Sequence, residues 1–156
     1  MAIDETRFRQ VMGHFATGVT VVTTMYNDEL YGLTVSSFAS LSLKPQLVLI
    51  SIDRTVRAHE GITGAGVFAV NILRENQEHL SRRFATRDID RFAEVEWQPS
   101  PWGIPLLGGV LATIECRVHS SLPGGDHTIF VGEVERVTIG EGDPLIYFRS
   151  GYRELA

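Results

Sequence analysis

The spacing of apolar residues near the start of the chain is that of a helix. Four large apolar residues recur at i, i+3, i+4 and i+7, namely Phe8, Val11, Met12 and Phe15. Asp4 stands just before them, at the position of a helix N-cap. The pattern predicts a short amphipathic helix over residues 4–16.

From Gly18 onward the pattern changes to the alternation that is typical of strands. Four such runs come before the middle of the chain: TGVTVVTT, LYGLTVSS, QLVLISI and GVFAVNIL. Three more follow in the second half: VLATIECRVHS, HTIFVGEVERVTI and DPLIYF. The turn sequence SLPGGD separates two of these runs, which predicts an antiparallel hairpin.

Helical patterns are few and short in the remainder of the chain. Residues 75–85 contain good helix formers, and residues 55–62 allow a turn or two of helix. About seven strands with no regular alternation of strand and helix favour a mainly β fold, a small antiparallel barrel with peripheral helices. Residues 86–109 hold three of the six prolines, and we interpret them as an ordered excursion within one domain that spans residues 1–156.

Composition excludes several classes of partner. The 156 residues are 44% hydrophobic, which is enough for one core, and the net charge of −5 argues against nucleic acid. Apolar runs are too short to span a membrane, and the charged N-terminus does not resemble a signal peptide. We therefore expect a cytoplasmic protein that binds no membrane. The single cysteine, Cys116, shares strand parity with apolar neighbours and is predicted to be an inert core thiol.

Motifs for several common chemistries are missing. The sequence has no Walker A loop, no dinucleotide GxGxxG, no zinc-binding spacing of Cys and His, and no GxSxG elbow. Nucleotide binding of those two kinds, a metal site and acyl transfer are therefore not expected.

One stretch, GLTVSSFASLSLKP (residues 32–45), is unusually rich in hydroxyls. These belong to Thr34, Ser36, Ser37, Ser40 and Ser42. The doublet Ser36-Ser37 interrupts strand parity, as a bulge would. The pattern has two interpretations: a half-exposed strand with a polar face, or a wall that presents amides and hydroxyls to a ligand.

Polar residues also gather at other strand ends. Ser51, Thr55 and Arg57 follow the buried-looking run QLVLI, and hydroxyls with a guanidinium at such a place suit a phosphate. Arg82 and Arg83 are adjacent on a predicted helix, so only one of them can face the body of the protein.

Two further side chains could contact a ligand. His127 precedes an apolar run just after a turn, where it serves as a structural residue or as a hydrogen-bonding group. Tyr152 either packs on the surface or covers a flat ligand.

Taken together, these blocks resemble the flavin reductase family with the FMN-binding split-barrel fold. The resemblance runs from about Phe8 to Tyr152 and rests on the order of FATGVTVVTT, GLTVSSFASLSLKP, LVLISIDRTVRAHE, FAVNIL, LSRRFA, PLLGGVLATIEC, GDHTIFVGEVE and LIYFRSGY. Members of this family are small NAD(P)H:flavin oxidoreductases of two-component monooxygenases. One departure is Gln46, which follows Pro45 where many members have a second proline; we expect it to begin a strand.

The resemblance implies a set of site residues. The flavin ring would lie along residues 34–37, and the phosphate between residues 51–57 and one arginine of the pair at 82 and 83. The cofactor-binding residues so implied are Thr34, Val35, Ser36, Ser37, Ser40, Ser42, Ser51, Ile52, Asp53, Thr55, Arg57, Arg82, Arg83 and Phe84. His127 and Tyr152 would border the nicotinamide, and His127 would hydrogen-bond to the cofactor or the nicotinamide during turnover.

The function implied is hydride transfer from NADH or NADPH to FMN or FAD, with reduced flavin passed to a partner monooxygenase. A homodimer is implied as well. The lack of an extra basic cluster for a 2′-phosphate favours NADH. Two alternatives stay open: a flavin-binding or carrier protein without turnover, and an FMN-dependent oxidase of the same fold.

Overall fold

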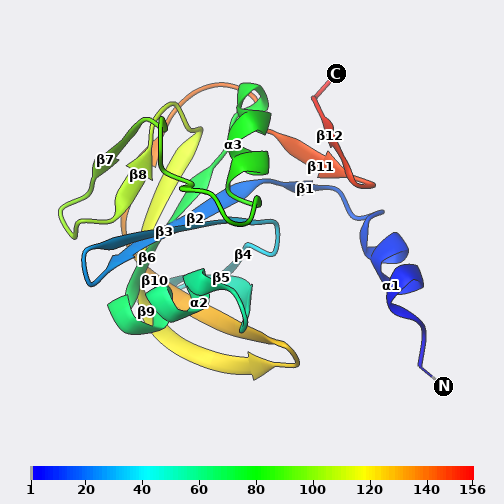
Figure 1. The fold of residues 1–156 in the computed structure, drawn as a ribbon, viewed down its shortest axis with the longest axis horizontal. Helices are drawn as coiled ribbons and strands as arrows, with labels where there is room; N and C mark the ends of the chain where they lie inside the picture. Colours follow the sequence, from blue (N-terminus) through cyan, green and yellow to red (C-terminus); the bar gives the residue numbers. More distant parts are fainter. Residues whose placement is uncertain (1) are drawn as a thin grey trace.

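The computed structural model describes residues 2–156, and antiparallel strands dominate it (Figure 1). The helical elements are α1 (Glu5–Met12), α2 (Arg57–Ala65), the 3₁₀ turn η1 (Glu75–Gln77) and α3 (Glu78–Arg83). The longer strands are β2 (Thr20–Tyr26), β3 (Glu29–Val35), β4 (Ala39–Leu43), β5 (Gln46–Asp53), β6 (Val67–Ile72), β9 (Ala112–Gly124) and β10 (His127–Ile139). The short strands are β1 (Thr17–Gly18), β7 (Trp97–Pro99), β8 (Pro105–Leu107), β11 (Ile146–Phe148) and β12 (Gly151–Arg153).

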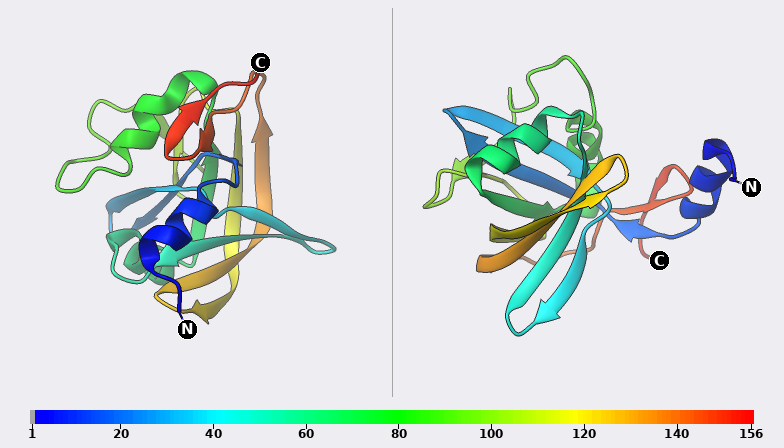
Figure 2. Two further views of the ribbon diagram at one scale, coloured as in Figure 1. Left: turned by 90° about the vertical axis from the view of Figure 1, so that its right-hand side faces the viewer. Right: turned by 90° about the horizontal axis from the view of Figure 1, so that it is seen from below.

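The seven longer strands form one antiparallel sheet in the order β3-β2-β6-β9-β10-β5-β4. The sheet curls until β3 approaches β5 (Figure 2). No ladder joins those two strands in residues 2–156; instead the Ser37 hydroxyl bonds both backbone groups of Ser51. This open seam makes the architecture a split barrel, as predicted, and Gln46 begins β5 as expected.

Alternation along the strands places one set of apolar side chains inside the barrel. The inner cluster contains Val22, Val35, Val48, Ile50, Ile52, Ile62, Phe68, Val70, Cys116 and Phe130. Helix α2 contributes Ile62 and packs against β2 and β3. Cys116 is fully buried, so its predicted place in the core is confirmed, and burial raises the pKa of its thiol to about 12.

A second apolar cluster lies outside the barrel, under α3 and the segment that follows it. Its buried members are Val19, Val21, Leu73, Leu80, Phe84, Leu107 and Leu145, and Phe92 packs against them. Residues 86–109 close this cluster and include the β7–β8 hairpin. The prediction of an ordered excursion at 86–109 is therefore confirmed.

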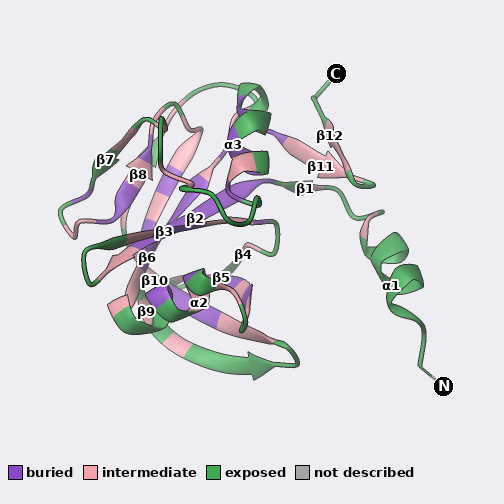
Figure 3. Cartoon of the chain, viewed as in Figure 1, coloured by how far each residue is buried: buried purple, intermediate pink, exposed green. Residues whose placement is uncertain are grey.

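Helix α1 stands away from the barrel (Figures 1 and 2). Its N-cap is as predicted, because the Arg7 amide donates to Asp4 Oδ1 at 2.8 Å, but the helix ends at Met12 and not at residue 16. None of its residues is buried, and Figure 3 shows it exposed along its length. Its base touches the C-terminal hairpin, where the Arg149 amide donates to the Gly13 carbonyl at 2.8 Å. Over residues 2–156, no helix has both the length and the apolar character needed to cross a membrane.

Candidate functional site

The hydroxyl-rich stretch is two strands and not one. β3 ends at Val35, residues 36–38 lie outside any strand, and β4 then begins at Ala39. At the break, Ser37 Oγ donates to the Ser51 carbonyl at 3.0 Å and accepts from the Ser51 amide at 3.1 Å. Small hydroxyl side chains that compete for backbone groups favour such interruptions. The break leaves the backbone of residues 36–38 outside the sheet ladder.

A cavity of about 850 Å³ opens on one side of this break. Its lining includes Ser36, Ser37 and Phe38 from the break, together with residues 16–20 and Tyr147. Arg9 and Met12 of helix α1 border it, as does Phe15 just after the helix. We refer to it as the serine-side cavity.

A second cavity, of about 730 Å³, lies at the other end of β3. It is lined by residues 30–32 of β3, residues 55–58 at the start of α2, and residues 87–92. Because Arg57, Arg87 and Arg91 all belong to this lining, we refer to it as the arginine-side cavity.

The loop between β5 and α2 is ordered by Asp53. Its Oδ1 accepts from the Thr55 amide at 2.8 Å and from the Thr55 hydroxyl at 2.7 Å. These two bonds lower the pKa of Asp53, and the neighbouring charge of His127 adds to the effect. Asp53 thus fixes the conformation of the loop. The Thr55 hydroxyl donates its proton to Asp53, so it can only accept a hydrogen bond from a ligand.

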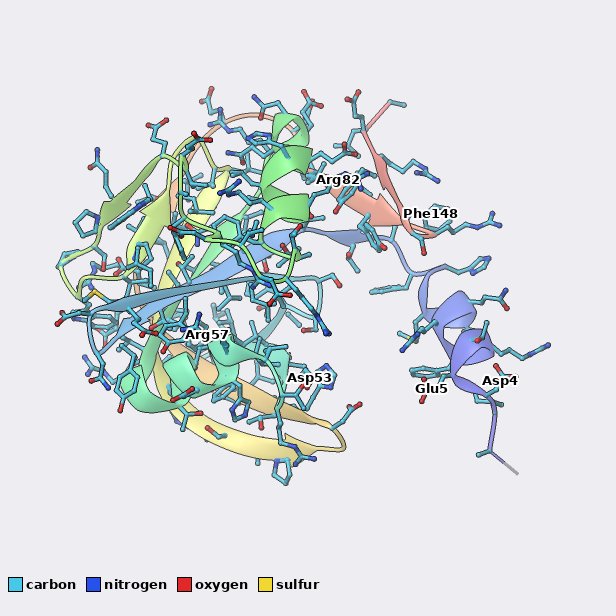
Figure 4. The ribbon with its side chains drawn as sticks, in the orientation of Figure 1. Asp4, Glu5, Asp53, Arg57, Arg82 and Phe148 are labelled. Atoms are coloured by element: carbon cyan, nitrogen blue, oxygen red, sulfur yellow. The ribbon has the colours of Figure 1, made fainter. Side chains whose placement is uncertain are left out.

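Arg57 opens α2 and faces the arginine-side cavity. Its Nη2 lies 2.7 Å from Glu29 Oε2, and its guanidinium sits 5.3 Å from the centre of the Tyr31 ring. Figure 4 shows Arg57 and Asp53 on the α2 side of the molecule. The cation is held in place but remains largely exposed, so it is available to an anion.

The end of α3 is attached to the edge of β3 through Thr34. The Thr34 hydroxyl donates to the Ser81 carbonyl at 2.6 Å, and the Thr34 amide donates to the Phe84 carbonyl at 3.1 Å. Thr34 belongs to the part of β3, residues 33–35, that lies between the linings of the two cavities, and its hydroxyl and amide are occupied by these bonds.

The paired arginines of α3 diverge, as their adjacency on a helix requires. Arg83 donates to the carbonyls of Arg91 and Asp90 at 2.7 and 2.8 Å, which places it on the side of the arginine-side cavity. Arg82 points to the C-terminal hairpin, where its guanidinium lies 5.0 Å from the centre of the Tyr152 ring (Figure 4). Arg83 is therefore the one that faces the body of the protein.

His127 lies opposite Asp53 in the β10–β5 pairing, at the same rim as the β5–α2 loop. Its Nδ1 is 2.7 Å from Asp126 Oδ1, a contact that favours the tautomer with the proton on Nδ1 and leaves Nε2 for another partner. Arg54 secures the hairpin tip, because its side chain donates to the Gly125 carbonyl and its amide to the Asp126 carbonyl.

Tyr152 packs on the protein itself. Its hydroxyl is 2.7 Å from Ser81 Oγ, and its ring meets Tyr147 edge-on with centroids 5.4 Å apart. It lines neither of the two cavities, whereas Tyr147 lines the serine-side cavity. Contact between Tyr152 and a nicotinamide stays a prediction, and Tyr147 is an aromatic that the sequence did not single out.

Several implied cofactor-binding residues have side chains that face away from both cavities. Val35 and Ile52 are buried in the inner cluster, and Phe84 is fully buried in the outer one, so only their backbone groups could reach a ligand. Ser40 and Ser42 lie on β4, on either side of a register shift, and line neither cavity.

Arg91 is the notable residue that the sequence did not reveal. Its Nη1 donates to the Gly32 carbonyl at 2.7 Å and its Nε to the Thr86 carbonyl at 3.0 Å, so it crosses the edge of β3. Burial lowers its pKa, and the nearby charge of Arg57 lowers it further. It lies in the aperiodic segment 86–109, where no pattern distinguishes it from a surface arginine.

The residues present fit a flavin. The break at 36–38 offers backbone groups for a flat polar edge, and Thr17 in the wall of the serine-side cavity has a buried hydroxyl without a hydrogen-bond partner in residues 2–156. Arg57 and Arg91 supply positive charge for phosphate at the far end of β3. The two cavities thus carry the kinds of groups that a flat, anionic ligand requires.

Comparison with known proteins identifies the family. The flavin reductase like domain matches residues 12–156. The reductase subunit HsaB of a flavin-dependent monooxygenase from Rhodococcus jostii is 44% identical over 152 residues, which cover 97% of this chain and 78% of HsaB. The reductase component of 4-hydroxyphenylacetate 3-monooxygenase from Thermus thermophilus is 42% identical, with 95% of each chain covered.

A solved structure gives the same result. The NADH:FAD oxidoreductase SgcE6 of Streptomyces globisporus, in complex with NAD and FAD fragments, superposes with a TM-score of 0.94 at 39% identity and covers 98% of this chain and 93% of its own. The chain therefore belongs to the flavin reductase family, and the predicted family and fold are confirmed.

Proposed function

We propose that this chain is an NADH-dependent flavin reductase that supplies reduced flavin to a partner monooxygenase. The observation that carries the proposal is the break in the sheet at residues 36–38, which lines the serine-side cavity and leaves backbone groups outside the sheet ladder. The relatives named above support it, since two are reductase parts of monooxygenases and one acts on NADH and FAD.

A flavin held here would supply the hydride acceptor, its N5, for C4 of the nicotinamide, and the role of the protein would be to align the two rings. Residues 36–38 would hold the polar edge of the flavin by backbone groups, while Arg57 and Arg83 lie on the side where its phosphate would bind. The serine-side cavity, with Tyr147 and Phe38 in its lining, leaves space for the nicotinamide over the ring. No protein acid or base is required for hydride transfer.

Steady-state NADH and NADPH oxidation with FMN, FAD and riboflavin tests this function. We expect rapid oxidation that depends on added flavin and that prefers NADH. A flavin-bound protein that is inert to NADH would indicate a carrier. Oxygen consumption with an amine or alcohol substrate and no nicotinamide would indicate an oxidase. Reduced flavin that does not support hydroxylation by any flavin-dependent oxygenase would contradict the role as a supplier.

For His127 we propose a supporting role: Nε2 hydrogen-bonds to the flavin or the nicotinamide while Asp126 holds Nδ1. His127→Ala should slow turnover several-fold and leave flavin affinity within about threefold, as loss of one neutral hydrogen bond does. The matched control is His119→Ala, an exposed histidine on β9. Loss of flavin binding with normal kinetics in the remaining holoprotein would refute the role.

We also propose a homodimer. Helix α1 and the turn after it present exposed apolar residues: Phe8, Val11 and Met12 of the helix and Phe15 beyond it are between 51% and 71% exposed. Leu41 and Leu43 on β4 are also exposed. Exposed apolar surface of this extent, on a helix that lies away from the barrel, is typical of a protein–protein interface. We propose that the partner is a second copy of this chain, since most soluble oligomers are homo-oligomers. Sedimentation velocity should give twice the chain mass of 17.3 kDa; a monomer at micromolar concentration would contradict the dimer.

A further inference from the structure

Helix α2 lies at the open seam of the barrel, where no ladder within residues 2–156 joins β3 to β5. It packs against β2 and β3 on one side of the seam and against β5 on the other. Its first turn has no side-chain N-cap, because the apolar Val56 stands at that position. The place of this turn therefore depends on the contacts that its side chains make with the strands.

Two side chains of the turn bond to strands on opposite sides of the seam. Arg57 Nη2 lies 2.7 Å from Glu29 Oε2, and Glu29 is the first residue of β3. His59 Nε2 lies 2.8 Å from the Thr128 hydroxyl on β10. Residues two apart on a helix are separated by about 200° around its axis, so these two side chains point to opposite sides of α2. The first turn of α2 is thereby attached to both parts of the split sheet.

Packing holds His59 on the β10 side as well. Its half-buried ring lies 5.3 Å from the ring of Phe130, centroid to centroid, and Phe130 belongs to the inner cluster. Thr128 and Phe130 are two residues apart on a strand, so both point to the same face of β10. A threonine hydroxyl can donate or accept, so the bond to Nε2 forms with either tautomer of His59.

The two parts joined in this way carry the groups assigned to the flavin. Arg57 belongs to the turn itself, and His127 precedes Thr128 on β10, opposite Asp53. The bond between His59 and Thr128 thus connects the turn that holds Arg57 to the strand end that holds His127. Without it, the remaining side-chain hydrogen bonds of the turn, within residues 2–156, reach β3 alone.

We propose that His59 is a positioning residue of the flavin reductase site. Its bond to Thr128 fixes the first turn of α2 relative to β10, so that Arg57 meets the flavin phosphate while the flavin ring lies near His127. His59 lines neither of the two cavities, so it acts through Arg57 and not on the ligand. The proposal rests on the proposed function, since it takes Arg57 as a phosphate-binding group.

Titration of the flavin-free protein with FMN, followed by quenching of flavin fluorescence, tests the proposal. His59→Phe keeps an aromatic ring beside Phe130 and removes the bond, Thr128→Val removes the bond from the other partner, and His59→Gln offers an amide to Thr128 in place of the ring. Ile62→Val is the matched control, because it removes one methylene from the buried face of α2 and leaves the bond intact. His59→Phe, Thr128→Val and Ile62→Val should each lower the Tm by about 2–4 °C.

His59→Phe and Thr128→Val should each raise the dissociation constant and the KM for FMN about threefold to tenfold, as loss of one hydrogen bond does. The kcat at saturating FMN and NADH should stay within about twofold of wild type, because the hydride-transfer geometry is unchanged once flavin is bound. The double variant should bind FMN no more weakly than either single variant, since both remove the same bond. His59→Gln should recover most of the affinity, and Ile62→Val should keep it within about twofold. In an Arg57→Gln background, His59→Phe should weaken FMN binding no further.

An FMN affinity in His59→Phe that equals that of wild type would overturn the proposal, as would an equal loss in Ile62→Val, which would make the effect one of stability alone. The same loss in His59→Phe with and without Arg57, or an unchanged affinity in Arg57→Gln, would also overturn it. If His59→Phe does not fold, Thr128→Val decides the question by the same comparisons. The proposed function fails separately, through absence of NADH oxidation with every flavin, whereas the positioning role is decided by FMN binding.

Discussion

The two serines at the break in the sheet, Ser36 and Ser37, make different contacts, so substitutions at the two positions should have different effects. Ser37 ties the segment just after β3 to β5 through its hydroxyl, with bonds of 3.0 and 3.1 Å to the backbone of Ser51. Ser36 is exposed, and the hydrogen bonds of residues 2–156 include none from its hydroxyl. Three variants separate the roles: Ser36→Ala, Ser37→Ala and Ser37→Leu.

The size of each effect follows from these contacts. A hydrogen bond of this kind contributes a net 0.5–1.5 kcal/mol, roughly, and water can replace part of it because the bridge is solvent-accessible. Ser37→Ala should therefore lower the free energy of unfolding by about 1 kcal/mol and the Tm by about 2–4 °C. Ser36→Ala should change stability by less than about 0.5 kcal/mol. Ser37→Leu adds bulk in the seam and should cost roughly 1–3 kcal/mol.

Flavin titration of the same variants tests the site. If backbone groups hold the flavin ring, Ser36→Ala should keep FMN affinity within about threefold, whereas Ser37→Leu should abolish binding because it separates β3 from β5. Urea unfolding followed by circular dichroism gives the stabilities, and fluorescence quenching gives the affinities. Loss of FMN in Ser36→Ala with retention in Ser37→Leu would refute the reasoning.

Three further outcomes are expected. Gly132→Ala should cost about 1–3 kcal/mol in urea unfolding, since its Cβ would lie 2.6 Å from Phe68 Cζ, and an unchanged midpoint would contradict this packing. The hydrogen bonds from Thr55 hold the pKa of Asp53 in the folded protein below its unfolded value of about 3.9, so Asp53→Asn should lower the free energy of unfolding above about pH 5. The difference in free energy of unfolding between wild type and variant should shrink as the pH falls through the folded pKa. A difference that persists at low pH would disprove this. Val11→Asp should shift sedimentation from dimer to monomer, and a stable dimer in this variant would exclude α1 from the interface.

The sequence predicted the elements whose pattern is long and regular. Seven runs correspond to β2, β3, β5, β6, β9, β10 and β11, and all three helical stretches were found. β4 was missed because the run through residues 32–45 reads as one strand, whereas Ser37 diverts it to a second. The three-residue strands β7, β8 and β12 are too short to show a period, and β7 and β8 each contain a proline.

Local patterns reached the candidate site only in part. The hydroxyl doublet predicted a bulge at Ser36-Ser37, and the structure has a break between two strands at residues 36–38. Strand alternation turns the side chains of Val35 and Ile52 into the core, so only their backbone groups could meet a ligand, as the resemblance implies for residues 34–37. The position of Arg91 over β3 depends on tertiary packing of an aperiodic segment, and no local pattern encodes it.

Anaerobic mixing of the protein and flavin with NADH, followed by flavin absorbance, tests the central claim most directly. We expect the oxidised flavin band to disappear in one turnover, more slowly when the transferred hydrogen at nicotinamide C4 is deuterium. Admission of oxygen should restore the band. A flavin that binds but stays oxidised in the presence of excess NADH would contradict the assignment of this chain as a flavin reductase.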